Sequence, residues 1–156
     1  MRNLLASDGA FNELELHLLS RLAQLIIPAS DTAPGASDGP IFALALQRLA
    51  AHAPVVQQGL AALQAAARQT LDKDFLGLDQ EQQLQLCESS MQAEFRAVFE
   101  KLVVMSYYED ERSMRAVGLP PRPAFPEGYV VAETDWSLTE PVRARGPIYR
   151  TVQPEP

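Results

Sequence analysis

The segment from residue 72 to residue 80 has oxygen-bearing side chains at spacings that resemble a calcium-binding loop. Four residues take the first, third, sixth and ninth places of such a loop: Asp72, Asp74, Gly77 and Gln80. The fifth place holds Leu76 and the twelfth holds Gln83, where calcium needs an oxygen ligand and a bidentate glutamate. We therefore interpret the segment as a turn between two helices, in which Asp79 and Gln82 form a capping pair.

The remaining reactive residue types do not assemble into a recognisable catalytic or metal site. Glu13 and His17 are one helical turn apart, but no second histidine-containing cluster completes a metal site, and His52 stands alone. Cys87 is the only cysteine, which excludes an intramolecular disulfide and a cysteine-rich metal or iron–sulfur site within this chain. The sequence has no Gly-x-Ser-x-Gly elbow and no phosphate-binding glycine loop. We expect no catalytic residue, cofactor or metal site in this chain.

Aromatic and arginine side chains give a different signal, that of a protein–protein interface. Eight of the 12 prolines follow Gly118, yet this segment keeps aromatic residues that a solvated tail would lack. We expect the arm to pack on its own helices or on another protein. Tyr107, Tyr108 and Trp136 could equally close the core, and the arginines could belong to a solvated arm. The predicted interface residues are Tyr107, Tyr108, Phe125, Tyr129, Trp136, Arg143, Arg145 and Tyr149.

Apolar residues three and four positions apart predict the helices that carry these side chains. The first helix is capped by Ser7 or Asp8 and ends at Pro28, and Ser37 or Asp38 caps the second. On the fifth helix, Phe95 and Met105 belong to one predicted apolar face, and its last turns are apolar nearly all round. We expect that end to be covered by the core and by something else. The predicted helices span about 8–27, 38–53, 54–71, 79–87, 91–108 and 110–117.

Length and composition define the class of protein. The 156 residues fit one domain, and 47% hydrophobic with 21% charged residues is the composition of a folded protein. The net charge of −7 argues against nucleic acid or anionic lipid as the main partner. No stretch of 18 apolar residues and no signal peptide is visible, so the chain as written is expected in the cytoplasm. A periplasmic location would require a removed signal or one on a partner.

These elements predict an all-α fold, a small bundle of five to six helices with an extended, proline-rich C-terminal arm. We expect residues 1–117 to form the helical domain and residues 118–156 to form the partner-binding arm. Arg143 and Arg145 alternate with proline and glycine, which indicates an extended strip within that arm.

Several short motifs, in this order and spacing, resemble the gluconate 2-dehydrogenase subunit 3 family. They span most of the chain: Leu25-Ile26-Ile27-Pro28-Ala29, Asp31, Pro34-Gly35-Ala36, Tyr107-Tyr108-Glu109-Asp110, Gly118-Leu119-Pro120, Asp135-Trp136-Ser137-Leu138 and Pro141-Val142-Arg143. The resemblance implies a small, non-catalytic subunit that binds a large flavin-dependent oxidoreductase of the glucose-methanol-choline type. That partner would hold FAD, oxidise a hydroxyl of a sugar, sugar acid or glycoside, and pass electrons to a cytochrome or another acceptor.

Family members often carry a twin-arginine export signal and are thought to help the large subunit fold or leave the cytoplasm. This sequence departs from that pattern, because Arg2 is solitary and no apolar signal core follows it. Two other classes of function remain open at this point. One is a stand-alone helical regulatory or small-molecule-binding module whose pocket is lined by the apolar end of the fifth helix. The other is a self-sufficient enzyme.

Overall fold

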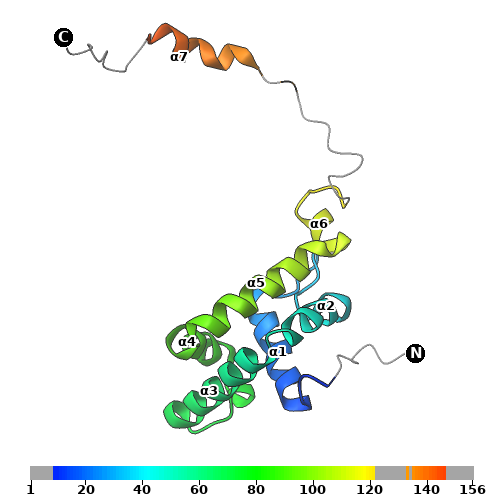
Figure 1. Ribbon diagram of the computed structural model, residues 1–156, viewed down its shortest axis with the longest axis vertical. Helices are drawn as coiled ribbons and strands as arrows, with labels where there is room; N and C mark the ends of the chain where they lie inside the picture. The colour runs from blue at the N-terminus through cyan, green and yellow to red at the C-terminus, as the bar shows by residue number, and fades with distance from the viewer. Residues whose placement is uncertain (1–8, 122–132, 134, 147–156) are drawn as a thin grey trace, which may run out of the picture. The chain divides into compact units, whose positions relative to one another are not determined.

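The computed structural model describes residues 9–121, 133 and 135–146, and the chain divides after Arg122 into two compact units (Figure 1). The regular elements of the described residues are all helices, with no strand among them, which confirms the predicted all-α class. The first unit holds α1 (Glu13–Ile26), α2 (Gly39–Ala50), α3 (Ala53–Leu71), the 3₁₀ turn η1 (Phe75–Gly77), α4 (Gln80–Ser90), α5 (Ala93–Glu109) and α6 (Glu111–Ala116). The second unit holds the 3₁₀ turn η2 (Trp136–Thr139) and α7 (Glu140–Ala144).

Local capping chemistry sets where α1 begins. The Asn12 side chain accepts a hydrogen bond from the Glu15 backbone N–H at 3.0 Å, and Glu15 accepts one from the Asn12 N–H at 2.8 Å. This reciprocal capping box satisfies two donors that the first helical turn leaves free. The predicted cap position was therefore wrong, because the helix begins at Glu13, after Asn12. The predicted caps Ser7 and Asp8 lie outside the described residues.

The turn that joins α1 to α2 is closed by a contact between backbone segments. The Ala36 N–H donates to the Ile27 carbonyl at 2.9 Å, and the side chain of Ala36 is fully buried. A β-carbon added to Gly35 would lie 2.8 Å from the backbone nitrogen of Ala29, closer than such atoms pack. Glycine at this position therefore lets the two segments of the loop approach each other, as the predicted structured loop requires.

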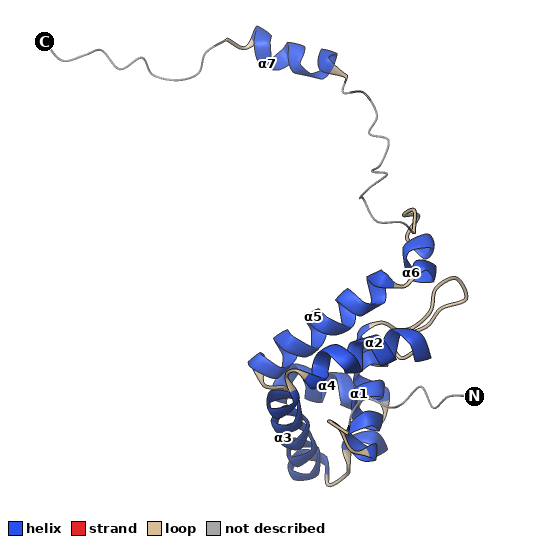
Figure 2. Ribbon diagram, turned by 45° about the vertical axis from the view of Figure 1, so that its right-hand side comes forward, coloured by secondary structure: helices blue, strands red, loops and turns tan. Residues whose placement is uncertain are grey.

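Helix α5 runs alongside α2 in the first unit (Figure 2). It packs against α2, α3 and α6, and its side chains Phe95, Phe99 and Val103 are fully buried. The rings of Phe95 and Phe99 lie with their centroids 5.6 Å apart in a tilted arrangement. At the far end of α6, Gly118 has a φ of +76° and the Leu119 N–H returns to the Met114 carbonyl at 2.9 Å. Gly118 thus ends α6 as predicted.

Helices α3 and α5 approach closely because Gly59 faces Phe95. A β-carbon at Gly59 would lie 2.3 Å from the Phe95 ring, so no larger residue fits without a shift of α5. Glycine costs stability in the middle of a helix. Here that cost is offset by the burial of a complete phenylalanine side chain at the helix crossing.

We predict that Gly59→Ala lowers the free energy of unfolding by about 1–3 kcal/mol, since the added methyl group overpacks the contact with Phe95. Urea unfolding followed by circular dichroism measures the change. Gly77→Ala is the matched control, because a β-carbon at Gly77 meets no atom within 4 Å. A Gly59→Ala variant as stable as the control would show that α3 and α5 are not in tight contact.

Candidate functional site

The two tyrosines at the end of α5 point in different directions. Tyr107 is 5% exposed and belongs to the core, whereas Tyr108 is 46% exposed. Their rings meet edge to face with centroids 5.2 Å apart. Two interpretations of this pair were left open, core residues or interface residues. Tyr107 is part of the core, and Tyr108 is the ring that a partner can reach. The interface role of Tyr108 stays a prediction.

The outer face of α5 carries apolar side chains that the first unit does not cover. Val104 and Met105 are exposed, Met105 by 44%, and with Tyr108 they lie opposite the buried Phe99–Val103 face. The prediction that Met105 shares the core face with Phe95 was wrong. At about 100° per residue, Met105 is turned about 200° from Val103, so it points away from the side of α5 on which Val103 is buried.

Arg48 of α2 holds the C-terminal end of α5 in position. Its Nη1 donates to the Ser106 hydroxyl oxygen at 3.0 Å, and its Nη2 donates to the Glu109 carboxylate at 2.6 Å. Ser106 in turn donates to the Leu102 carbonyl at 2.8 Å. The polar groups at this crossing are thereby satisfied next to the buried face of α5.

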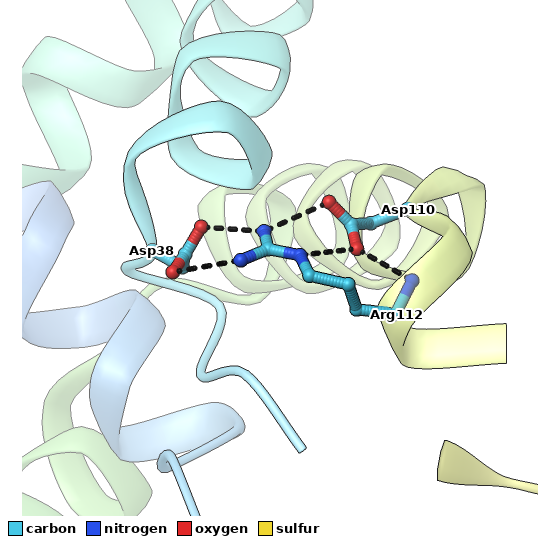
Figure 3. A network of polar contacts seen from close by, with 3 residues as sticks. All are labelled: Asp38, Asp110 and Arg112. Atoms are coloured by element: carbon cyan, nitrogen blue, oxygen red, sulfur yellow. Dashed lines mark hydrogen bonds and ion pairs between the residues drawn. The ribbon is translucent and has the colours of Figure 1, made fainter. Parts of the chain in front are cut away.

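Arg112 joins the start of α6 to the start of α2 (Figure 3). Its Nη2 donates to Asp38 Oδ1 at 2.7 Å and to Asp110 Oδ2 at 2.9 Å, and its Nη1 donates to Asp38 Oδ2 at 3.3 Å. Asp110 also caps α6, because its Oδ1 accepts from the Arg112 N–H at 2.9 Å. Asp38 takes the predicted N-cap position of α2, but its side chain makes no cap hydrogen bond and binds Arg112 instead. One guanidinium thus connects two carboxylates far apart in the sequence.

The electrostatics of this network follow from its hydrogen bonds. Hydrogen bonds from the Arg112 side chain hold the pKa of Asp110 below its ordinary value, although burial raises it. Backbone hydrogen bonds and the positive charge of Arg112 lower it further. Asp110 and then Asp38 raise the pKa of Arg112. The Asp110 carboxylate is therefore charged at neutral pH. An arginine between two carboxylates stabilises a fold, and these three residues form a structural clamp at the α5–α6 junction.

The turn from residue 72 to residue 80 is built from structural contacts, as predicted. Asp74 accepts from Arg68 Nε at 2.7 Å, and Asp79 and Gln82 form the predicted capping box. The buried side chains of Gln64 and Gln83 bind the backbone N–H and C=O of Phe75 at 2.8 and 2.9 Å: Gln64 accepts from the N–H and Gln83 donates to the C=O. These two glutamines satisfy the backbone hydrogen-bonding groups of Phe75. Their spacing in the sequence did not predict this role.

His17 and His52 are both exposed and stand apart from each other in the described part of the chain. Within residues 9–121, 133 and 135–146, no group of three or more His, Cys, Asp or Glu side chains is arranged to hold a metal ion. In the same ranges, no helix is both long enough and apolar enough to cross a membrane.

The second unit contains the predicted interface residue Trp136 on η2 and Arg143 on α7, with Arg145 directly after α7. The extended strip predicted around Arg143 was therefore wrong for residues 141–144, which are helical. Asp135 begins the segment by accepting from the Ser137 N–H at 3.0 Å and from its hydroxyl at 2.6 Å. These bonds keep the pKa of Asp135 below its ordinary value. The segment was predicted as extended because it contains proline. Proline also fits the first turn of a helix, which is where Pro141 lies in α7.

Apolar side chains of this segment are open to solvent. Trp136 is 67% exposed, and Leu138 and Val142, spaced four apart, are 75% and 62% exposed. Leu138 and Val142 were not among the predicted interface residues, although their spacing is a signal of a shared helix face. Arg143 and Arg145 are exposed beside them. The predicted interface residues Phe125, Tyr129 and Tyr149 lie outside the described residues, and their roles stay predictions.

A pocket of about 150 Å³ opens between α1, α4 and α5. It lies along the first half of α5, not at the apolar C-terminal end where a pocket was predicted for the stand-alone module. Burial raises the pKa of the Cys87 thiol in its wall to about 11, against a smaller lowering effect of Arg96. Cys87 is therefore an unreactive packing residue at neutral pH, as its sequence context indicated.

The described structure defines a small helical protein with exposed apolar side chains on α5 and on the η2–α7 segment. Comparison with known proteins gives its family. The family model described as gluconate 2-dehydrogenase subunit 3 matches residues 13–115, and the chain belongs to this family. The name of the family is that of one subunit of a dehydrogenase complex. Neither the search of curated proteins nor the search of solved structures gave a match.

The match covers α1 to α6 and so includes the clamp formed by Asp38, Asp110 and Arg112. It ends before the second unit, whose likeness to the family therefore rests on the short motifs around Trp136 and Val142 alone. The family assignment confirms the resemblance read from the sequence. It leaves the individual interface residues as predictions.

We predict that Arg112→Ala lowers the free energy of unfolding at pH 7 and that the difference from the unmodified chain shrinks in acid. The folded-state pKa of Asp110 is lowered, so its contribution is complete above the unfolded-state value of about 3.9 and is lost as the pH falls through the folded-state pKa. Thermal unfolding between pH 7 and pH 3 measures this dependence.

Arg115→Ala is the control for the clamp, because Arg115 pairs with Glu111 on the same short helix and both side chains are mostly exposed. Such exposed pairs contribute little, so this variant should stay close to the unmodified chain at every pH. Equal losses in the two variants, or a loss in Arg112→Ala that does not depend on pH, would contradict the clamp.

Proposed function

We propose that this chain is a non-catalytic accessory subunit that binds and stabilises a large FAD-dependent oxidoreductase of the glucose-methanol-choline type. The partner oxidises a hydroxyl of a sugar, sugar acid or glycoside, and its electrons pass to a cytochrome or another acceptor outside this chain. Membership of the gluconate 2-dehydrogenase subunit 3 family supports a place in a dehydrogenase complex. The chemistry is assigned to the partner.

The observation that carries the proposal is the exposure of Trp136, Leu138 and Val142 on one short helical segment. Tryptophan is among the residues that contribute most binding energy in protein interfaces. A helical segment of this length is marginal by itself in water, so its stability depends on capping and on packing against a larger surface. Asp135 supplies the cap, and we assign the packing surface to the large subunit.

The α1–α4–α5 pocket is too small to hold FAD. Pockets that hold drug-sized ligands usually enclose about 300–1,000 Å³, whereas this pocket encloses about 150 Å³. Its walls are mainly leucine, isoleucine, methionine and phenylalanine side chains, which offer few groups to a pyrophosphate. The residues present here do not fit a dinucleotide.

The stand-alone module is the alternative, and one experiment separates it from the subunit. The full-length chain carries an affinity tag in its native host, and the captured protein is identified by mass and by its absorbance spectrum. We expect a stoichiometric large protein with the absorbance of oxidised flavin. A chain recovered alone as a stable monomer, with no flavoprotein bound, would contradict the subunit and favour the module.

We predict that Trp136→Ala weakens the complex with the flavoprotein by about 1–4 kcal/mol, because it removes a large aromatic anchor from the interface. Leu138→Ala should weaken the complex by a smaller amount. Titration of the purified large subunit with each variant, followed by calorimetry, measures the affinity. Both variants should keep the unfolding temperature of the free chain, since both side chains are exposed.

Leu76→Ala is the control for the loss of an exposed leucine, because Leu76 is also exposed but lies on η1 in the first unit. It should bind like the unmodified chain. An affinity unchanged by Trp136→Ala and Leu138→Ala would refute the role of the arm and leave the remaining surface as the interface.

A further inference from the structure

We propose that the pocket between α1, α4 and α5 receives one apolar side chain of the large subunit, with a lysine or arginine of that subunit beside it at the pocket mouth. The inference rests on the proposed function and adds a second contact surface, on the first unit and separate from the arm. It names the chemistry of the group that binds there.

The walls of the pocket favour an apolar occupant. Leu22 and Ile26 come from α1, Met91 follows α4, and Phe99 comes from α5. Leu22 and Phe99 are buried at the base, whereas Leu84 of α4 stands exposed at the side of the opening. Water inside such walls has few hydrogen-bond partners, so its displacement by an apolar group is favourable.

The volume of the pocket selects a single side chain over a cofactor or metabolite. A space of about 150 Å³ holds a group with the size of a benzene ring or a branched aliphatic side chain. Well-packed pockets filled by one anchor residue are typical of the energetic centres of protein interfaces. The occupant is therefore a leucine, methionine or phenylalanine of a protein partner.

The charges at the mouth define what must lie next to that anchor. Glu88 of α4 and Glu100 of α5 both line the pocket and are both exposed. The one arginine there, Arg96, is directed to the end of α4, where its Nη2 donates to the carbonyls of Cys87 and Glu88. It offsets the negative end of α4. Two carboxylates remain for a partner, and they favour a cation beside the apolar anchor.

Cys87 provides a direct readout, because it lines the pocket and is the only cysteine of the chain. Its thiol is half-buried in the free chain and can be alkylated slowly at alkaline pH. Iodoacetamide labelling at pH 9, read from the mass of this chain, therefore reports access to the pocket. We expect the bound large subunit to slow the labelling of Cys87 by at least about tenfold.

A substitution at the opening tests the same site independently. Leu84→Trp places a bulky side chain at an exposed position of the mouth and should weaken the complex at least about tenfold. Leu76→Trp enlarges an exposed leucine that does not line the pocket and should have no effect. Unchanged unfolding temperatures of the free variants exclude a loss of folding as the cause.

The charge requirement has its own matched pair of variants. Glu88→Gln with Glu100→Gln should slow association and reduce its dependence on salt, since the attraction for the partner's cation is removed. Glu81→Gln with Glu94→Gln removes two exposed glutamates from the same two helices, away from the pocket, and should change association less.

The outcomes separate this inference from the proposed function. If the flavoprotein binds but Cys87 labels at the same rate and Leu84→Trp binds normally, the pocket is not part of the interface and the accessory role stands. If no flavoprotein binds the full-length chain, both proposals fall. Protection of Cys87 together with weakened binding of Leu84→Trp, but not of Leu76→Trp, establishes the pocket as a partner-binding site.

Discussion

The first unit depends on the burial of one face of α5. Phe95, Phe99 and Val103 fill the space against α2 and α3, and Gly59 lets α3 come close enough to close that space. A small chain has limited core volume, so only one side of a helix this apolar can be buried within it. The opposite side, with Met105 and Tyr108, stays exposed. Exposed apolar surface of this kind usually belongs to an interface.

Two arginines fix the helices around this core without adding reactive groups. Arg48 secures the C-terminal end of α5, and Arg112 holds α6 to the start of α2. Each arginine is bound to a carboxylate of the same unit. The polar contacts of these two arginines thus involve other residues than the exposed apolar side chains of α5 and of the η2–α7 segment.

Local signals in the sequence predicted the elements well. Pro28 and Gly118 mark helix ends, and the pairing of Asp79 with Gln82 identifies the start of α4, because each acts on its own backbone neighbours. The clamp could not be found in this way, since Asp38 and Arg112 are 74 positions apart and meet only in the folded chain. The helix at Trp136–Ala144 was missed because proline and glycine nearby also suit extended chain.

We propose that this chain supplies binding surface and that its partner supplies the chemistry. The most direct test measures flavin content and sugar-dependent dye reduction for the isolated chain, the isolated large subunit and the reconstituted complex. We expect a colourless and inactive small chain, with all flavin and all turnover in the large subunit, and a more stable holoenzyme in the complex. Dye reduction by the small chain alone would contradict it.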